Sequence, residues 1–307
     1  MHVVTRFGCV AVVLSVLVGT AGAQGLPQLT LSETETEVVS TLRMLDVLVI
    51  EHEGLLSVHT RETLNELVVA YLERMSRLGT LFMTRHCLTD EDLRLLQGVP
   101  IKGLVVGSAD ISNEGVLLLA NMPALTSFAV WDGGVTDEDL RRLSGLNHLT
   151  KLTVQKSGVT DIGLQHVSKM RQLETLGFFK CPGITNTGVK GISKLPSLER
   201  LFLNNNEGLT SSVLQDLATI KNLKRLEIDG MKVIDAEVAH LKALSSLDYL
   251  SITSSDLGDH GLAHLESMNS LRSLNLKRTK ITDGGLATVG KLTGLEMLGL
   301  SVTVHGY

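Results

Sequence analysis

Hydrophobic residues follow two alternating spacings along most of the chain. In residues 149–159, the alternation across Leu152 and Val154 predicts a short strand. In residues 160–170 the spacing changes to three from Leu164 onward, which predicts one face of a short helix. The same split recurs in segments that begin at Leu125, Leu173, Leu198, Leu223, Leu247, Leu271 and Leu295. The pattern therefore predicts a series of strand–helix units.

The units form a tandem array with a period of about 24 residues. Each junction between strand and helix carries an anchor position, which is usually Thr or Ser, and the next residue is usually Asp. The anchors are Thr89, Ser112, Thr136, Thr160, Thr185, Thr210, Ile234, Gly258 and Thr282, separated by 23 to 25 residues. A Thr or Ser there predicts a helix N-cap, and we interpret the Asp that follows as a charge facing the positive end of its helix.

These residues resemble the leucine-rich repeat family, whose pattern is L-x-x-L-x-L followed by a slot for Asn, Cys or Thr. The slot holds Ser157, Cys181, Asn206, Ser255 and Thr279, and departs from the pattern at Ala109, Gly133 and Met231. The resemblance is to the cysteine-containing subclass and to exported bacterial proteins of this type. It implies an α/β fold, a right-handed solenoid curved like a horseshoe, with parallel concave strands and short convex helices. It covers residues 78–307, about nine to ten copies.

Residues 24–77 fit the repeat less well. The segment 42–47 could begin a degenerate first copy, and 60–77 has the pattern of an amphipathic helix. We expect a helical N-terminal cap, because an end repeat otherwise exposes its core. The alternative is the N-terminal half of an F-box, which would make the chain a substrate receptor of a ubiquitin ligase complex, but no recognisable F-box pattern is present.

Residues 1–23 have the pattern of a secretory signal peptide. Arg6 precedes an apolar run over 7–18, and Ala21 and Ala23 form an A-x-A site before Gln24. The run of 12 residues is shorter than the roughly 20 that a membrane span needs. We predict cleavage after Ala23 and export to the periplasm or the extracellular space, with no membrane span.

The mature chain would keep two cysteines, Cys87 and Cys181. They occupy similar positions four repeats apart, which at one strand spacing per repeat is about 19 Å. A disulfide requires Cα atoms within about 7 Å. We therefore expect free, buried thiols.

Aromatic residues are scarce although the chain is 43% hydrophobic, since Phe, Trp and Tyr make up only 3%. Thin coils accept Leu, Val and Ile better than rings. Phe128 and Phe178 fall at core positions, whereas the other set falls on the expected concave face: Phe82, Trp131, Phe179, Phe202 and Tyr249. Exposed rings at these positions would favour protein binding. The alternative is that each ring only covers the aliphatic side chains of the neighbouring strand.

We predict a partner-binding surface in the central part of this face. Its candidates combine aromatic and basic residues with an acidic band: Trp131, Gln155, Lys156, Phe179, Lys180, Phe202, Asn204, Glu227 and Asp229. A second basic group, Lys277 and Arg278, follows the acidic band. Such banding would orient a partner more than strengthen its binding. The net charge of −5 does not suggest a nucleic-acid ligand.

No catalytic or cofactor motif is found in the sequence, and we expect neither an enzyme nor a bound cofactor. The strongest candidates for chemistry are His240, His260 and His264, which with Asp256 or Asp259 could form a metal site. Duplication of one ancestral repeat explains the recurring His equally well, and we expect no metal. The sequence thus predicts an exported, non-catalytic binding or scaffold protein.

Overall fold

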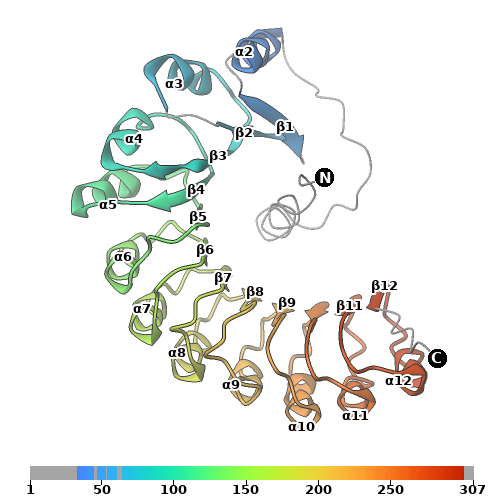
Figure 1. The fold of residues 1–307 in the computed structure, drawn as a ribbon. Coiled ribbons are helices and arrows are strands. Elements are labelled where there is room, and N and C mark those ends of the chain that lie inside the picture. The colour runs from blue at the N-terminus through green and yellow to red at the C-terminus, as the bar shows by residue number, and fades with distance from the viewer. Residues whose placement is uncertain (1–32, 45–46, 53, 61–63, 301–307) are drawn as a thin grey trace, which may run out of the picture. The chain divides into compact units, whose positions relative to one another are not determined.

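The computed structural model describes residues 33–44, 47–52, 54–60 and 64–300 (Figure 1). The predicted signal peptide lies outside the described residues. The chain forms two compact units that divide between Trp131 and Asp132, inside the repeat array. We call them the N-terminal unit and the C-terminal unit.

The described part of the N-terminal unit begins with a helix, a hairpin and a second helix. Strand β1 pairs antiparallel with β2, and the strands from β2 to β5 are parallel. The elements are α2 (Glu33–Met44), β1 (Leu48–His52), β2 (Leu55–His59), α3 (Glu66–Glu73), β3 (Leu78–Leu88), α4 (Asp90–Leu95), β4 (Gly103–Ala109), α5 (Asn113–Ala120) and β5 (Ser127–Val130). Helix α3 occupies the middle of the segment expected to be an amphipathic helix, and it buries Val68, Val69 and Leu72.

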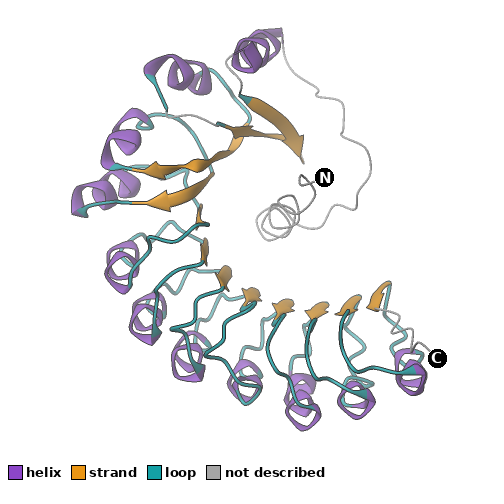
Figure 2. Cartoon of the chain, viewed as in Figure 1, coloured by secondary structure: helices purple, strands orange, loops and turns teal. Residues whose placement is uncertain are grey.

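The C-terminal unit repeats one strand and one helix per coil (Figure 2). Its strands are parallel and follow one another in chain order. Its elements are α6 (Asp137–Leu143), β6 (Lys151–Gln155), α7 (Asp161–Val167), β7 (Thr175–Phe179), α8 (Asn186–Ile192), β8 (Arg200–Phe202), α9 (Val213–Leu217), β9 (Arg225–Glu227), α10 (Asp235–Val238), the 3-10 helix η1 (Ala239–Ala243), β10 (Tyr249–Ser251), α11 (Asp259–Ala263), β11 (Ser273–Leu276), α12 (Asp283–Val289) and β12 (Met297–Leu300). The predicted strand–helix order is confirmed.

The core of the C-terminal unit is a column of leucines that lie side by side in the sheet. Each pairs in register with the next, and all are fully buried: Leu152, Leu176, Leu201, Leu226, Leu250 and Leu274. Burying a leucine side chain contributes roughly 1.5–3 kcal/mol. The leucine of each coil is covered by the coil that follows it. The coils are therefore stable only as a stack. In β12, the last described strand, Leu298 is 38% exposed.

The Asp or Asn after six of the nine anchors binds the next coil rather than its own helix alone. Asp137 Oδ1 accepts the backbone N–H groups of Thr160 (2.8 Å) and Gly163 (3.0 Å), and its Oδ2 accepts the Thr160 hydroxyl (2.6 Å). In five further pairs the anchor N–H of the following coil donates to Oδ1 of the corresponding side chain, which is an amide in Asn186 and a carboxylate in the others: Asp90–Ser112, Asp161–Thr185, Asn186–Thr210, Asp235–Gly258 and Asp259–Thr282. We call these contacts the carboxylate ladder. Our interpretation of the Asp as a partner of its own helix dipole was incomplete.

The ladder explains the glycine three residues after several anchors. A Cβ atom on Gly163 would lie 2.5 Å from Asp137 Oδ1, and one on Gly285 would lie 2.6 Å from Asp259 Oδ1. These contacts are shorter than real Cβ atoms tolerate. Glycine therefore lets each carboxylate reach the backbone of the following coil.

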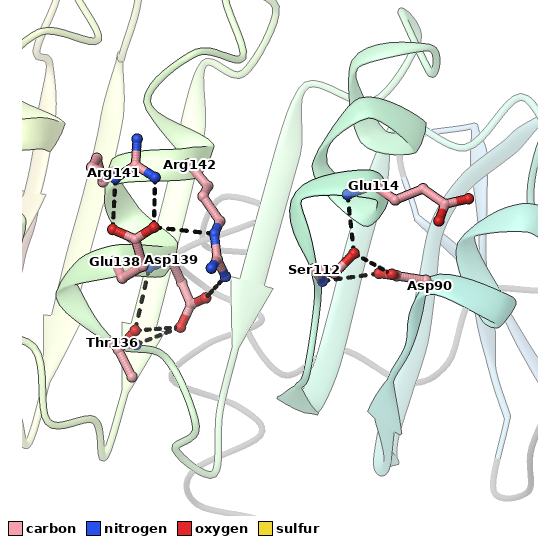
Figure 3. A network of polar contacts seen from close by, with 8 residues as sticks. All are labelled: Asp90, Ser112, Glu114, Thr136, Glu138, Asp139, Arg141 and Arg142. Atoms are coloured by element: carbon pink, nitrogen blue, oxygen red, sulfur yellow. Dashed lines mark hydrogen bonds and ion pairs between the residues drawn. The ribbon is translucent and has the colours of Figure 1, made fainter.

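Two anchors are held within their own coil. Thr136 forms a capping box, in which its N–H donates to Asp139 Oδ2 (2.8 Å) and its hydroxyl accepts the Asp139 N–H (3.3 Å). Figure 3 shows this box and, separately, the ladder contact between Ser112 and Asp90. Thr89 forms the same box with Asp92.

Six of the nine anchors are confirmed as N-caps, because their side chains accept a backbone N–H of the helix that follows. The other three anchors differ. Helix α9 begins after Ser212 rather than after Thr210, because the segment 210–212 forms an extra turn. Ile234 and Gly258 precede their helices without a side-chain cap, since neither carries an acceptor atom.

Replacement of Asp137 by alanine should lower the free energy of unfolding by about 2 kcal/mol, because three hydrogen bonds to the neighbouring coil are lost. Urea unfolding followed by circular dichroism measures this change. Asp283→Ala is the matched control, because Asp283 holds the same position in α12 but makes no hydrogen bond to any described residue. Equal losses in both variants would assign the effect to the helix dipole instead.

Candidate binding surface

The side chains that point away from the leucine column form one face of the C-terminal unit, which we call the strand face. Strand alternation places on it the residues before and after each core leucine. Among the predicted binding residues it gathers Gln155, Phe179, Phe202 and Glu227. Trp131 belongs to the N-terminal unit.

The aromatic residues of the predicted site are buried, and our expectation that they are exposed was wrong. The exposed fraction is 9% for Trp131, 6% for Phe179 and 0% for Phe202. The Phe179 ring lies over Gly177, where a Cβ atom would come within 2.9 Å of the ring, and it packs against Phe202 at a centroid distance of 6.2 Å. The rings cover the neighbouring strands, as the alternative interpretation held.

A buried ion pair lies beside these rings. The Arg225 guanidinium donates from Nε (3.2 Å) and Nη2 (2.9 Å) to Glu227 Oε1, and it stacks on Tyr249 at 3.7 Å from the ring centroid. Phe202 lies on the same guanidinium at 5.7 Å. Asn204 Nδ2 donates to the other Glu227 oxygen (3.1 Å). Arginine, carboxylate and two rings thus hold one another in fixed positions.

Burial controls the electrostatics of this group. Loss of water raises the pKa of Glu227, against the opposing effect of the Arg225 charge. Burial also raises the pKa of Tyr249, to which the carboxylate of Glu227 contributes. Only 9% of Arg225 and 4% of Glu227 are exposed. The pair carries a desolvation cost without adding to the leucine core.

Asp229 is held by the neighbouring strand. Its Oδ1 atom accepts the Ser251 hydroxyl (2.7 Å) and the Thr253 N–H (2.8 Å), while its own N–H donates to Asn204 Oδ1 (3.0 Å). The acidic band predicted from Glu227 and Asp229 therefore exists, but both carboxylates are already engaged. The basic candidates Lys156 and Lys180 are exposed just after the ends of β6 and β7.

The N-terminal unit has an aromatic cluster of its own, which the sequence did not reveal beyond Phe82 and Trp131. His59 lies parallel to Phe82 at a centroid distance of 4.1 Å, and Trp131 meets Phe82 edge-on at 6.5 Å. His59 Nε2 and Trp131 Nε1 have no hydrogen-bond partner among the described residues. Desolvation lowers the pKa of His59 to about 4. The histidine is therefore neutral at physiological pH.

Both described cysteines are free. Cys181 is buried as expected, and desolvation raises the pKa of its thiol. Cys87 is exposed, so the expectation of a buried thiol was wrong there, because this residue lies near the irregular end of β3, where the register with β4 shifts.

The histidines considered as metal ligands do not converge with their proposed carboxylates. Asp256 pairs with Lys280 (2.7 Å), and Asp259 accepts from Thr282 in the carboxylate ladder. Across the described ranges no three His, Cys, Asp or Glu side chains gather as a metal site would require. The same ranges contain no helix that is long and apolar enough to cross a membrane.

The comparisons with known proteins agree with the coils described above. A family model described as Leucine Rich repeat matches residues 267–290, which contain β11 and α12. An internalin (inlF) from Listeria monocytogenes is 19% identical, with a TM-score of 0.55 over 87% of this chain and 84% of that chain. Internalin C2 from the same species is 22% identical, with a TM-score of 0.49 over 76% and 84%. No curated protein sequence matches the chain.

The matched repeat and the shared fold define the class of fold: the chain has the leucine-rich repeat fold, in which strand–helix coils follow one another.

The neutral His59 predicts a pH-dependent stability. Because its pKa is about 4 in the native state and 6.5 in the unfolded state, its protonation favours unfolding as pH falls from 6.5 toward 4. The expected loss is about 3 kcal/mol over this interval. Unfolding curves at several pH values measure it.

His59→Phe keeps a flat ring against Phe82 and should remove this part of the pH dependence. His260→Phe, at an exposed position of α11, controls for the loss of a histidine. An unchanged pH profile in His59→Phe would contradict the assignment.

Proposed function

We propose that this protein is an exported, non-catalytic binding module that holds a partner protein on the strand face of the C-terminal unit. The observation that carries the proposal is the group formed by Phe202, Arg225, Glu227 and Tyr249. It lies on the side of the sheet away from the leucine column. Its ion pair is buried, although the packing of the leucine core does not require it. Arginine and aromatic side chains in fixed positions dominate the energetics of protein interfaces.

The predicted binding residues divide into two roles. Lys156, Lys180 and the half-buried Asp229 can touch a partner directly, together with the half-buried Tyr249. The others act from beneath by fixing the surface: Gln155, Phe179, Phe202, Asn204 and Glu227. Trp131 would contribute through the N-terminal unit.

A binding role fits the class, because leucine-rich repeat proteins typically act as protein-binding scaffolds and are generally not enzymes. Stacked repeats offer an extended surface on which neighbouring coils each contribute a few side chains. The metal-dependent alternative has no support of this kind, because Asp256 and Asp259 serve other contacts.

Export rests on the signal-peptide pattern of residues 1–23. N-terminal sequencing of the protein recovered from the periplasm or medium should begin at Gln24. A cytoplasmic chain that begins at Met1 would contradict export and leave the binding proposal to its own test.

The binding proposal is tested by selecting peptide ligands from a random display library on the wild-type protein. Tyr249→Ala should weaken the selected ligands at least tenfold, because the ring and its contact with Arg225 are lost. Tyr71→Ala in α3 is the matched control, since Tyr71 is also half-buried and also contacts an arginine, Arg74. Fluorescence anisotropy measures both.

Two outcomes would contradict the proposal. One is that no ligand is enriched on the folded wild-type protein. The other is that Tyr249→Ala, with an unfolding temperature equal to the wild type, binds every selected ligand as well as the wild type does.

A further inference from the structure

One residue per coil adopts a left-handed backbone conformation just after its strand. The positions recur every 24 or 25 residues, and we call them the corner row. They are Lys156 (φ 51°), Lys180 (φ 54°), Asn205 (φ 58°), Gly230 (φ 75°), Ser254 (φ 53°) and Arg278 (φ 57°). All six residues are exposed.

At five of the six positions the backbone N–H donates to the following coil. The N–H of Lys156 donates to Phe179 O (2.8 Å), that of Lys180 to Asn204 O (3.0 Å), and that of Asn205 to Asp229 O (2.7 Å). Gly230 and Ser254 donate to the following coil in the same way. Glycine and asparagine are the residues that adopt positive φ most readily. Three of the six positions nevertheless carry a lysine or arginine, so the row keeps basic side chains where the backbone does not favour them.

The corner row presents positive charge at both ends. One end carries Lys180, and the other carries Arg278 with its neighbour Lys277 on the strand face. Lys180 and Lys277 are exposed, and within the described chain the side chain of neither makes a hydrogen bond or ion pair. Lys156 pairs with Asp132 at 2.7 Å. The acidic residues of the strand face are engaged elsewhere, Glu227 with Arg225 and Asp229 with Ser251. Uncharged residues, Asn205, Gly230 and Ser254, occupy the middle of the row.

The spacing of the charges fits an extended peptide. Neighbouring strands lie about 4.8 Å apart, so the four coils between Lys180 and Arg278 span about 19 Å. An extended chain advances about 3.3 Å per residue, and about six residues cover this distance. The exposed side chains of Asn205 and Ser254 can hydrogen-bond the amide groups between the two ends.

We propose that the corner row binds an extended acidic peptide segment of a partner protein, with carboxylates about six residues apart that meet Lys180 at one end and Lys277 with Arg278 at the other. This rests on the proposed binding function and names the chemistry of the partner. A polysaccharide or single-stranded nucleic acid fits less well, because both use exposed aromatic faces for stacking, and Phe179 and Phe202 are buried.

The probe is a fluorescein-labelled peptide, Glu-Glu-Ser-Gly-Ser-Gly-Glu-Glu, titrated with the full chain and followed by anisotropy. The wild type should bind it, with an affinity that falls as salt is raised. Lys180→Gly should weaken binding about threefold and Lys180→Gly combined with Lys277→Ser about tenfold, since two of the charges are lost. A peptide with Gln in place of Glu should not bind. Lys190→Gln, an exposed lysine on α8 of the same coil, is the control and should bind as the wild type does.

A second readout separates binding from folding. Lys180→Gly relieves the left-handed backbone, as Gly230 does in its own coil, and should raise the unfolding temperature by about 2 °C while it weakens the peptide. Loss of binding therefore cannot come from loss of structure.

The proposal is overturned if the wild type does not bind the peptide, if the Gln peptide binds equally well, or if the double variant keeps full affinity. A polyuronate that binds in place of the peptide and is sensitive to Lys180 would assign the row to a polysaccharide instead. Display ligands that lose affinity in Tyr249→Ala but carry no acidic residues would leave the binding function standing and reject only this inference. Failure of both experiments would reject both.

Discussion

The hydrogen bonds that pass from one coil to the next are the interaction on which the remaining structure depends. In the C-terminal unit a coil of about 24 residues has a strand of three to five residues and a helix of one or two turns, which are too short to be stable alone. The carboxylate of Asp137 and the backbone N–H of Lys156 each bind the following coil. They determine the length of the repeat, the glycine beside each carboxylate and the left-handed corner.

Much of this architecture could be predicted from sequence because it depends on local patterns. Alternation across Leu152 and Val154 predicted β6, and the Thr160-Asp161 pair predicted the start of α7. The use of the Asp side chain could not be inferred in the same way, since a carboxylate in a first helical turn suits its own helix equally well. A signal was present, however. The glycine at Gly163 makes sense only if another group needs its space.

The binding surface was harder to predict, because exposure depends on neighbours that are distant in sequence. Alternation placed Phe179 and Phe202 on the correct side of the strands. The Phe179 ring lies against the sheet instead of pointing into solvent because Gly177 has no side chain beneath it and because Phe202 packs beside it. The ion pair of Arg225 with Glu227 was missed for a related reason. The two residues have opposite charges two positions apart on one strand, and sequence alone does not show that they are buried.

The corner row and the carboxylate ladder use different residues of each coil. The ladder binds coils together through the anchor, the Asp and the glycine, whereas the corner contributes its backbone N–H to the fold and leaves its side chain in solvent. Any residue that tolerates positive φ can occupy the corner without disturbing the stack, as the sequence Lys, Lys, Asn, Gly, Ser, Arg illustrates. The side chains of the corner row can therefore change one coil at a time without disturbing the fold. A surface with a new binding specificity can arise by substitution at a corner or by duplication of a coil.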